Sequence, residues 1–171
     1  ADQTRMMGIV TTAPETGYYV DVFRSREEKG GDKMHDYFYH NLGQTLTLTA
    51  ADGTDLNLQP TEELAFAGAH LYAYSYLYDK KVAATGKDVK ATFTIDMKDK
   101  GGDDISMNLW MKGEPDREVF TALSPMTEGL SRTPGMPYNI KEQPTLTFVA
   151  RQHGEAWNRP FVAVYEPRTR K

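Results

Sequence analysis

The chain has 171 residues, of which 39% are hydrophobic and 26% are charged, and this composition is typical of one globular domain. Its net charge of −4 argues against general nucleic-acid binding, because phosphate neutralisation requires an excess of lysine and arginine. The sequence has no cysteine, which excludes disulfides, thiolate metal sites and cysteine nucleophiles. No apolar run approaches the roughly 20 residues of a transmembrane helix, so we expect no membrane span.

Short alternating runs separated by Gly, Pro, Asn and Asp predict strands in the first third of the chain. The expected strands cover residues 7–12, 18–25, 34–41 and 44–50. The polar segment 26–33 contains Gly30 and Gly31, and it predicts a hairpin that pairs the second strand with the third. Asp52 and Gly53 predict a further turn of the hairpin type.

Short alternating runs separated by turn residues continue to the end of the chain. One short helical turn is expected over residues 61–69, and Gly68 ends it early. Further strands are expected over residues 70–78, 87–97, 105–112, 117–123, 145–152 and 159–166. Residues 124–144 contain four prolines and form the longest irregular stretch, which predicts a loop that is functional, packed over an edge or disordered. The chain is therefore expected to be all-β, a single antiparallel β-sandwich domain of about ten strands spanning residues 1–171, with little or no helix.

Motifs of complete active sites are missing from the sequence. It contains no phosphate-binding glycine loop, no Gly-x-Ser-x-Gly elbow and no His-Glu-x-x-His zinc motif. The densest cluster of chemically active residues is the run HDYFYH, residues 35–40. On a strand, Asp36 and His40 share one face but lie about 13 Å apart, too far to hold one metal ion. We therefore expect no catalytic residue, no metal and no cofactor in this chain.

His35 and Tyr37 share the other face of that strand. A lyase that eliminates across a uronic acid needs a base and an acid, and histidine and tyrosine fill these roles. Packing inside a sandwich is the commoner use of such residues, so we name His35 and Tyr37 only as candidates for carbohydrate contact. If the hairpin centres near Lys29, Arg24 lies diagonal to Asp36, which predicts a structural Arg24–Asp36 ion pair.

A row of tyrosines is the second notable pattern. If residues 70–78 form a strand, Tyr72, Tyr74, Tyr76 and Tyr78 lie on one face. An exposed row would offer a platform on which sugar rings stack, whereas a buried row would be core packing. We take Tyr72, Tyr74 and Tyr76 as candidate carbohydrate-binding residues.

Arg159 stands near Trp157 in the turn before the last strand. Arg159 is a further candidate for contact with an acidic glycan. In the alternative interpretation, Trp157 closes one end of the sandwich and the turn has a structural role. The basic residues 168–171 are expected to fray.

These segments resemble one known family, the heparinase II/III polysaccharide lyases. The residues that carry the resemblance are Tyr18, Asp21, Phe23, Arg24, His35, Asp36, Tyr37 and His40. The later segments NLWMKGEPDREVFTA and RQHGEAWNRPFVAVYEP are also similar to the C-terminal region of the family. The resemblance implies a C-terminal β-domain cut from a larger enzyme. It also implies that the catalytic groups lie in a missing helical toroid or at its junction with this domain.

The resemblance further implies a periplasmic or secreted bacterial enzyme that cleaves glycosaminoglycan-like or alginate-like polymers by β-elimination without an organic cofactor. No signal peptide is visible in the chain. The family's His-x-His-x-Asp segment has no match here, so no catalytic or zinc-binding residue is carried over.

Three functions remain open. An accessory domain of a lyase predicts an exposed apolar or mixed patch where the missing catalytic domain docks. A free-standing carbohydrate-binding module predicts an exposed aromatic row at Tyr72, Tyr74 and Tyr76. A small autonomous lyase predicts a cleft with Tyr, His and Arg around a perturbed titrating group.

Overall fold

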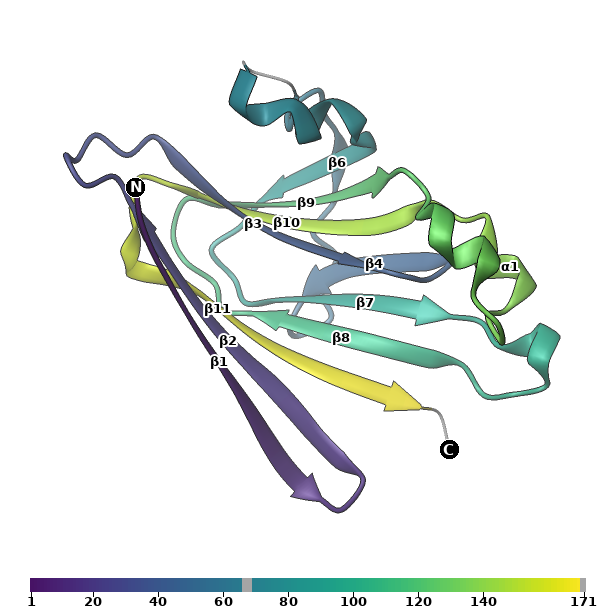
Figure 1. Cartoon of the computed structure of the whole chain (residues 1–171). Helices are drawn as coiled ribbons and strands as arrows, with labels where there is room; N and C mark the ends of the chain where they lie inside the picture. Colours follow the sequence, from purple (N-terminus) through teal and green to yellow (C-terminus); the bar gives the residue numbers. More distant parts are fainter. Residues whose placement is uncertain (66–68, 170–171) are drawn as a thin grey trace.

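Two antiparallel β-sheets face each other in the computed structural model, which describes residues 1–65 and 69–169 (Figure 1). Sheet A has the strand order β1 (Asp2–Ala13), β2 (Thr16–Arg26), β11 (Ala156–Thr169), β8 (Ile105–Met111), β7 (Val89–Ile95) and β4 (Thr45–Ala50). Sheet B has the order β3 (Met34–Asn41), β10 (Thr145–His153), β9 (Arg117–Ser124), β6 (Tyr78–Ala84) and β5 (Gln59–Pro60). The expected all-β antiparallel sandwich is confirmed.

Helical segments in the described chain are short. They are three 3₁₀ helices, Ala69–Tyr76, Lys98–Lys100 and Glu128–Arg132, and one α-helical turn, α1 (Tyr138–Lys141). Glu128–Arg132 and α1 interrupt the expected loop 124–144. In the described part of the chain, no helix is long and apolar enough to cross a membrane.

Alternating side chains of both sheets build the main core. The fully buried residues with the largest side chains in this core are Phe93, Leu109, Met111, Phe148 and Phe161. A second cluster lies on the outer face of sheet B, where Phe120, Val149 and Ala122 meet Leu64 and Leu77. Sheet B therefore has a cluster of apolar side chains on each face.

One predicted strand pairing is wrong. Strand β2 pairs with β1 and β11 in sheet A, whereas β3 pairs with β10 in sheet B. The segment between β2 and β3 thus crosses from one sheet to the other and does not form a hairpin. The expected Arg24–Asp36 ion pair does not form between these two described residues. Arg24 donates instead to the carbonyl oxygen of Trp157, and Asp36 pairs with Arg151, its register partner on β10.

The predicted strand over residues 70–78 is also wrong. This stretch is mainly the 3₁₀ helix Ala69–Tyr76, and the strand that follows, β6, starts at Tyr78. Tyr72 and Tyr76 are 65% and 61% exposed, whereas Tyr74 is half-buried, so the tyrosines do not form one flat row. The short helical turn expected over 61–69 falls partly on residues 66–68, outside the described residues, and the basic end 168–171 lies partly outside as well.

A buried carboxylate connects the two sheets beside the β1–β2 hairpin. Asp21 of β2 is fully buried and accepts hydrogen bonds from Arg5 Nε at 2.9 Å and from the Tyr37 hydroxyl at 2.5 Å. The Tyr37 hydroxyl is also hydrogen-bonded to that of Tyr165. A buried charge is stable only where it is paired and hydrogen-bonded, so this network fixes β1, β2, β3 and β11 relative to one another.

We expect the Arg5→Ala variant to lower the free energy of unfolding by about 2 kcal/mol, because Asp21 loses the cation that pairs with it among the described residues. Chemical denaturation monitored by circular dichroism measures this change. Arg132→Ala is the matched control, since Arg132 forms an exposed ion pair with Glu128 and its removal should cost less than about 0.5 kcal/mol. Equal effects of the two variants would contradict a stabilising role for the Asp21 network.

Alkaline pH should destabilise the domain through four tyrosines. Burial raises the pKa of Tyr37, Tyr39 and Tyr74, and it raises the pKa of Tyr165 to about 12. Unfolded tyrosines lose their proton near pH 10. Above about pH 10 the unfolded state therefore binds fewer protons than the folded state, and the free energy of unfolding falls as pH rises toward about 12.

Each such tyrosine adds up to about 1.4 kcal/mol per pH unit to that slope. Denaturation curves collected at intervals between about pH 9 and 11 measure it. The Tyr165→Phe variant should show a shallower decline than the unmodified chain. An unchanged slope would show that Tyr165 does not titrate on unfolding.

Candidate functional site

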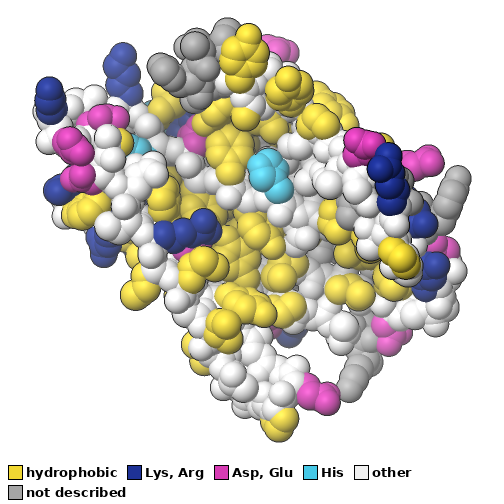
Figure 2. Space-filling view, in the orientation of Figure 1, with side chains coloured by type: hydrophobic (Ala, Val, Ile, Leu, Met, Phe, Trp, Pro, Cys, Tyr) yellow, Lys and Arg dark blue, Asp and Glu magenta, His cyan; other side chains and the backbone are white. Residues whose placement is uncertain are grey.

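A pocket of about 570 Å³ lies on the outer face of sheet B. Its volume falls in the range of about 300–1,000 Å³ that is typical of small-molecule sites. Three elements line it: β3, the 3₁₀ helix with the residue that follows it, and the end of β9. The lining residues are Asp36, Phe38, His40, Ala73, Tyr74, Tyr76, Leu77, Ser124 and Pro125. On the face shown in Figure 2, hydrophobic side chains gather in the middle with one histidine among them.

An ion cluster adjoins the pocket and contributes Asp36 to its lining. Arg151 donates from Nε and Nη2 to the two carboxylate oxygens of Asp36, each at 2.8 Å. Its Nη1 reaches Glu63 at 3.3 Å, and the guanidinium lies over the ring of Phe120. The Tyr74 hydroxyl donates to Asp36 Oδ2 at 2.6 Å. Burial and this hydrogen bond raise the pKa of Tyr74, so its hydroxyl holds the 3₁₀ helix against β3 as a proton donor.

Aromatic rings form the second wall. The ring of Phe38 meets that of Tyr74 edge to face, with centroids 5.3 Å apart, and it stacks on the ring of His40 at 5.9 Å. His40 Nδ1 lies 2.9 Å from the hydroxyl of Thr147, which in turn is hydrogen-bonded to Ser124 at 2.7 Å. Desolvation lowers the pKa of His40, which favours the neutral ring. Its Nε2 has no partner among the described residues.

This arrangement is suited to binding. A concave apolar surface with a few oriented polar groups is the usual form of a site for a small organic ligand. Asp36, Tyr74 and Ser124 are hydrogen-bonded within the protein, whereas His40 Nε2 is left for a ligand, and the described residues include no group of three or more His, Asp or Glu that would hold a metal ion.

The structure brings together only some of the residues selected from the sequence. Tyr74 and Tyr76 line the pocket, and Tyr72 lies on the same helix outside the lining. His35 and Tyr37 are on the opposite face of β3, where His35 contacts Asp32 at 2.6 Å and Tyr37 belongs to the Asp21 network. The role of these residues in carbohydrate binding stays a prediction.

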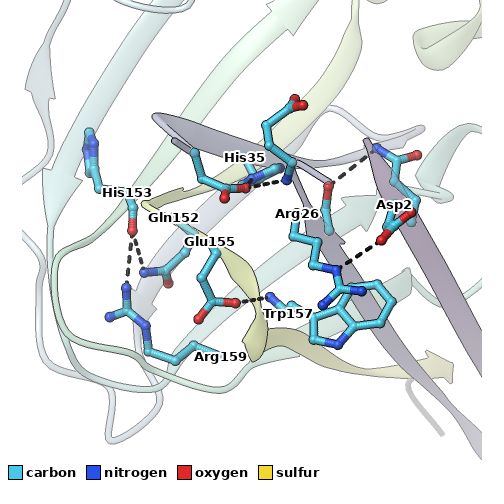
Figure 3. A network of polar contacts seen from close by, with 12 residues as sticks. Asp2, Arg26, His35, Gln152, His153, Glu155, Trp157 and Arg159 are labelled. Carbon is cyan, nitrogen blue, oxygen red and sulfur yellow. Dashed lines mark hydrogen bonds and ion pairs between the residues drawn. The ribbon is translucent and has the colours of Figure 1, made fainter. Parts of the chain in front are cut away.

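Arg159 belongs to a different cluster at one end of the sandwich (Figure 3). Its Nη2 donates to the carbonyl oxygen of His153 at 3.2 Å. Nearby, the guanidinium of Arg26 lies 4.2 Å from the centre of the Trp157 ring, and Glu155 accepts the backbone N–H of Trp157. These contacts agree with the structural interpretation of the turn, and its contact with a glycan stays a prediction.

Sequence reasoning did not assign the most central pocket residues to a site. Period-2 alternation placed Asp36, Phe38 and His40 on one face of β3, and this signal was available. Ser124 and Pro125 carried no comparable signal, because they reach the pocket only through the pairing of β9 with β10.

We expect Tyr74→Phe to lower the free energy of unfolding by about 1–2 kcal/mol, since Asp36 loses a hydrogen bond to a charged acceptor. Tyr76→Phe is the matched control. Its ring is exposed at the pocket mouth, and its change should stay within about 0.5 kcal/mol. Thermal and denaturant unfolding of both variants measure the difference. A Tyr74→Phe variant as stable as the control would mean that this hydrogen bond does not hold the helix.

Comparison with known proteins gave one clear relationship. No family model matches the chain. Over 170 residues the chain is 34% identical to an endo-acting ulvan lyase from Formosa agariphila, and the alignment covers 97% of the chain. The chain spans only 19% of the length of that relative. It is therefore related to one part of a polysaccharide lyase, and this finding does not single out the heparinase II/III family.

Proposed function

We propose that this chain is a non-catalytic β-sandwich domain of a polysaccharide lyase, which supports the catalytic domain and flanks its glycan cleft. One observation carries the proposal: nearly the whole chain matches a segment that is 19% of an endo-acting ulvan lyase. A segment of that share fits an accessory domain better than a complete enzyme. We also propose that residues 1–171 form one domain. We propose further that the parent protein acts on an acidic polysaccharide outside the cytoplasm.

The finer proposal is a domain of the heparinase II/III type, C-terminal in its parent and next to a helical catalytic domain. The contacts of the motif residues support a structural role for the residues that carry the resemblance. The Tyr37 hydroxyl donates a hydrogen bond to Asp21. Arg24 donates to the Trp157 carbonyl oxygen, and Asp36 forms an ion pair with Arg151. Such residues preserve a domain architecture, which is what an accessory domain has to share with its relatives.

The chemistry of the described residues also favours a non-catalytic role. Elimination needs a base within hydrogen-bond reach of the proton that it removes and an acid for the leaving oxygen. Tyr37 and Tyr165 are buried and hydrogen-bonded to each other, and Tyr74 donates to Asp36. The guanidinium of Arg151 is paired with Asp36 and Glu63, so it is not available to neutralise a substrate carboxylate. The base and the acid would then come from the catalytic domain.

The β1–β2 hairpin is the surface that we propose for docking of the catalytic domain. Figure 1 shows this hairpin reaching away from sheet B, with β1 at the edge of sheet A. Met7 is 64% exposed and Ile9 is 75% exposed on the face that β1 shares with Asp21, and Met6 is exposed on the other face. An apolar edge strand exposed on both faces marks an interaction surface, because proteins usually protect such edges.

A second candidate is a carbohydrate-binding module that acts independently of a neighbouring domain. The pocket with Phe38, Tyr74 and Tyr76 favours it, because aromatic rings beside a few polar groups suit the apolar face and the hydroxyls of a sugar. The two candidates share the pocket and differ in whether the β1–β2 hairpin needs a partner.

The test of a non-catalytic role is to incubate the chain with ulvan, heparin, heparan sulfate, chondroitin sulfate and alginate. The ultraviolet absorbance of the unsaturated uronate reports elimination, and circular dichroism confirms that the domain is folded. We expect no product from any of the five polymers. Product that survives repurification, disappears in His40→Ala and persists in the matched control His153→Ala would overturn the proposal, because the pocket would then be an active site.

A further inference from the structure

We infer that the pocket on the outer face of sheet B binds an uncharged sugar unit and discriminates against uronate and sulfated units. The inference rests on the proposed function and deepens it, since it names the part of a polysaccharide that the domain would recognise. In a polysaccharide with charged and uncharged units, such a pocket would bind the uncharged units and so determine how the polysaccharide aligns on the domain.

The charge of the pocket disfavours an anionic ligand. None of the described lining residues is a lysine or an arginine. The adjoining cation is Arg151, which is 9% exposed and whose three guanidinium nitrogens all contact Asp36 or Glu63. Two carboxylates thus surround one guanidinium. An anionic sugar would meet net negative charge and no free cation, which weakens its binding.

The histidine does not change this balance. His40 is the one histidine among the described lining residues, and desolvation lowers its pKa, so the ring is neutral at neutral pH. A neutral imidazole donates or accepts hydrogen bonds but supplies no charge for a carboxylate or sulfate. The net charge of the whole chain, −4, adds to the discrimination against anions.

The hydrogen-bonding groups of the pocket fit hydroxyls. A carboxylate has about four acceptor positions. Among the described residues, Asp36 Oδ1 accepts one hydrogen bond, from Arg151, and Oδ2 accepts two, from Arg151 and Tyr74. A position on Oδ1 is left for a donor, and a sugar hydroxyl donates where a sulfate or an ionised carboxylate cannot. His40 Nε2 and the Ser124 hydroxyl offer further contacts on the same wall.

The aromatic rings supply the apolar contact. Phe38 is fixed between Tyr74 and His40 by ring contacts, so it presents a rigid surface inside the pocket. Tyr76 is largely exposed and stands at the mouth, where its ring is available to a ligand. Aromatic rings bind ligands with an apolar body and a polar edge, and a pyranose has this shape.

The experiment is a titration of the intact chain, observed by NMR chemical-shift changes, with two matched pairs of sugars. One pair is methyl glucoside and methyl glucuronide, and the other is galactose and galactose 6-sulfate. We expect the neutral member of each pair to bind at least about fivefold more tightly than the charged member. Equal or tighter binding of the charged members would overturn the inference, and so would the absence of binding by every sugar.

Two variants locate the binding. Tyr76→Ala should weaken binding of the neutral sugars at least about fivefold, because one stacking surface is removed. Tyr19→Ala is the matched control, because Tyr19 is an exposed tyrosine on β2 of sheet A, outside the lining, and its removal should leave the binding unchanged. Ala73→Lys places a cation on the pocket wall and should shift the preference toward the charged members. Sugar affinities that are unchanged in both Tyr76→Ala and Ala73→Lys would place the sugar elsewhere and overturn the inference.

These outcomes are separable from those of the proposed function. Elimination of a polymer by this chain would overturn the non-catalytic role whatever the pocket binds. A chain that forms no product and binds no neutral sugar would keep the accessory role and lose the pocket inference.

Discussion

The paired carboxylate of Asp36 determines the character of the outer face of sheet B. It accepts two hydrogen bonds from Arg151 on the neighbouring strand and one from Tyr74 on the 3₁₀ helix above. Because a buried carboxylate needs these donors, the pair and the helix are held in one arrangement. The pocket exists between them, and its lack of a free cation follows from the same contacts. Its shape and the selectivity that we infer for it therefore have one origin.

Strand β3 serves two networks because its side chains alternate. One face turns Tyr37 toward the core, where it donates to Asp21 and connects the sheets. The other face turns Asp36 and Phe38 toward the pocket. A change of register by one residue would exchange the faces and disrupt both networks, so we expect this strand to tolerate insertions poorly.

The two surfaces proposed for function have different physical properties. The hairpin of β1 and β2 exposes flexible apolar side chains such as Met7 and Ile9 along an open edge, which suits a protein partner. The pocket presents rigid rings and oriented polar groups, which suits a small polar ligand. A domain that holds a glycan with one surface and a catalytic domain with another would keep the substrate near the active site.

The sequence by itself determined the fold class and most strand positions, because alternation and turn residues are local signals that survive in the folded chain. It also determined that Asp36, Phe38 and His40 share a face. Only the tertiary structure decided which strands pair: Arg151 meets Asp36 across 115 positions, and no local pattern encodes that contact. The aromatic alternation over 70–78 favoured a strand by itself. In the fold, the Asp36 carboxylate and the apolar cluster around Leu77 stabilise a 3₁₀ helix there instead, since burial and hydrogen bonding outweigh a weak local propensity.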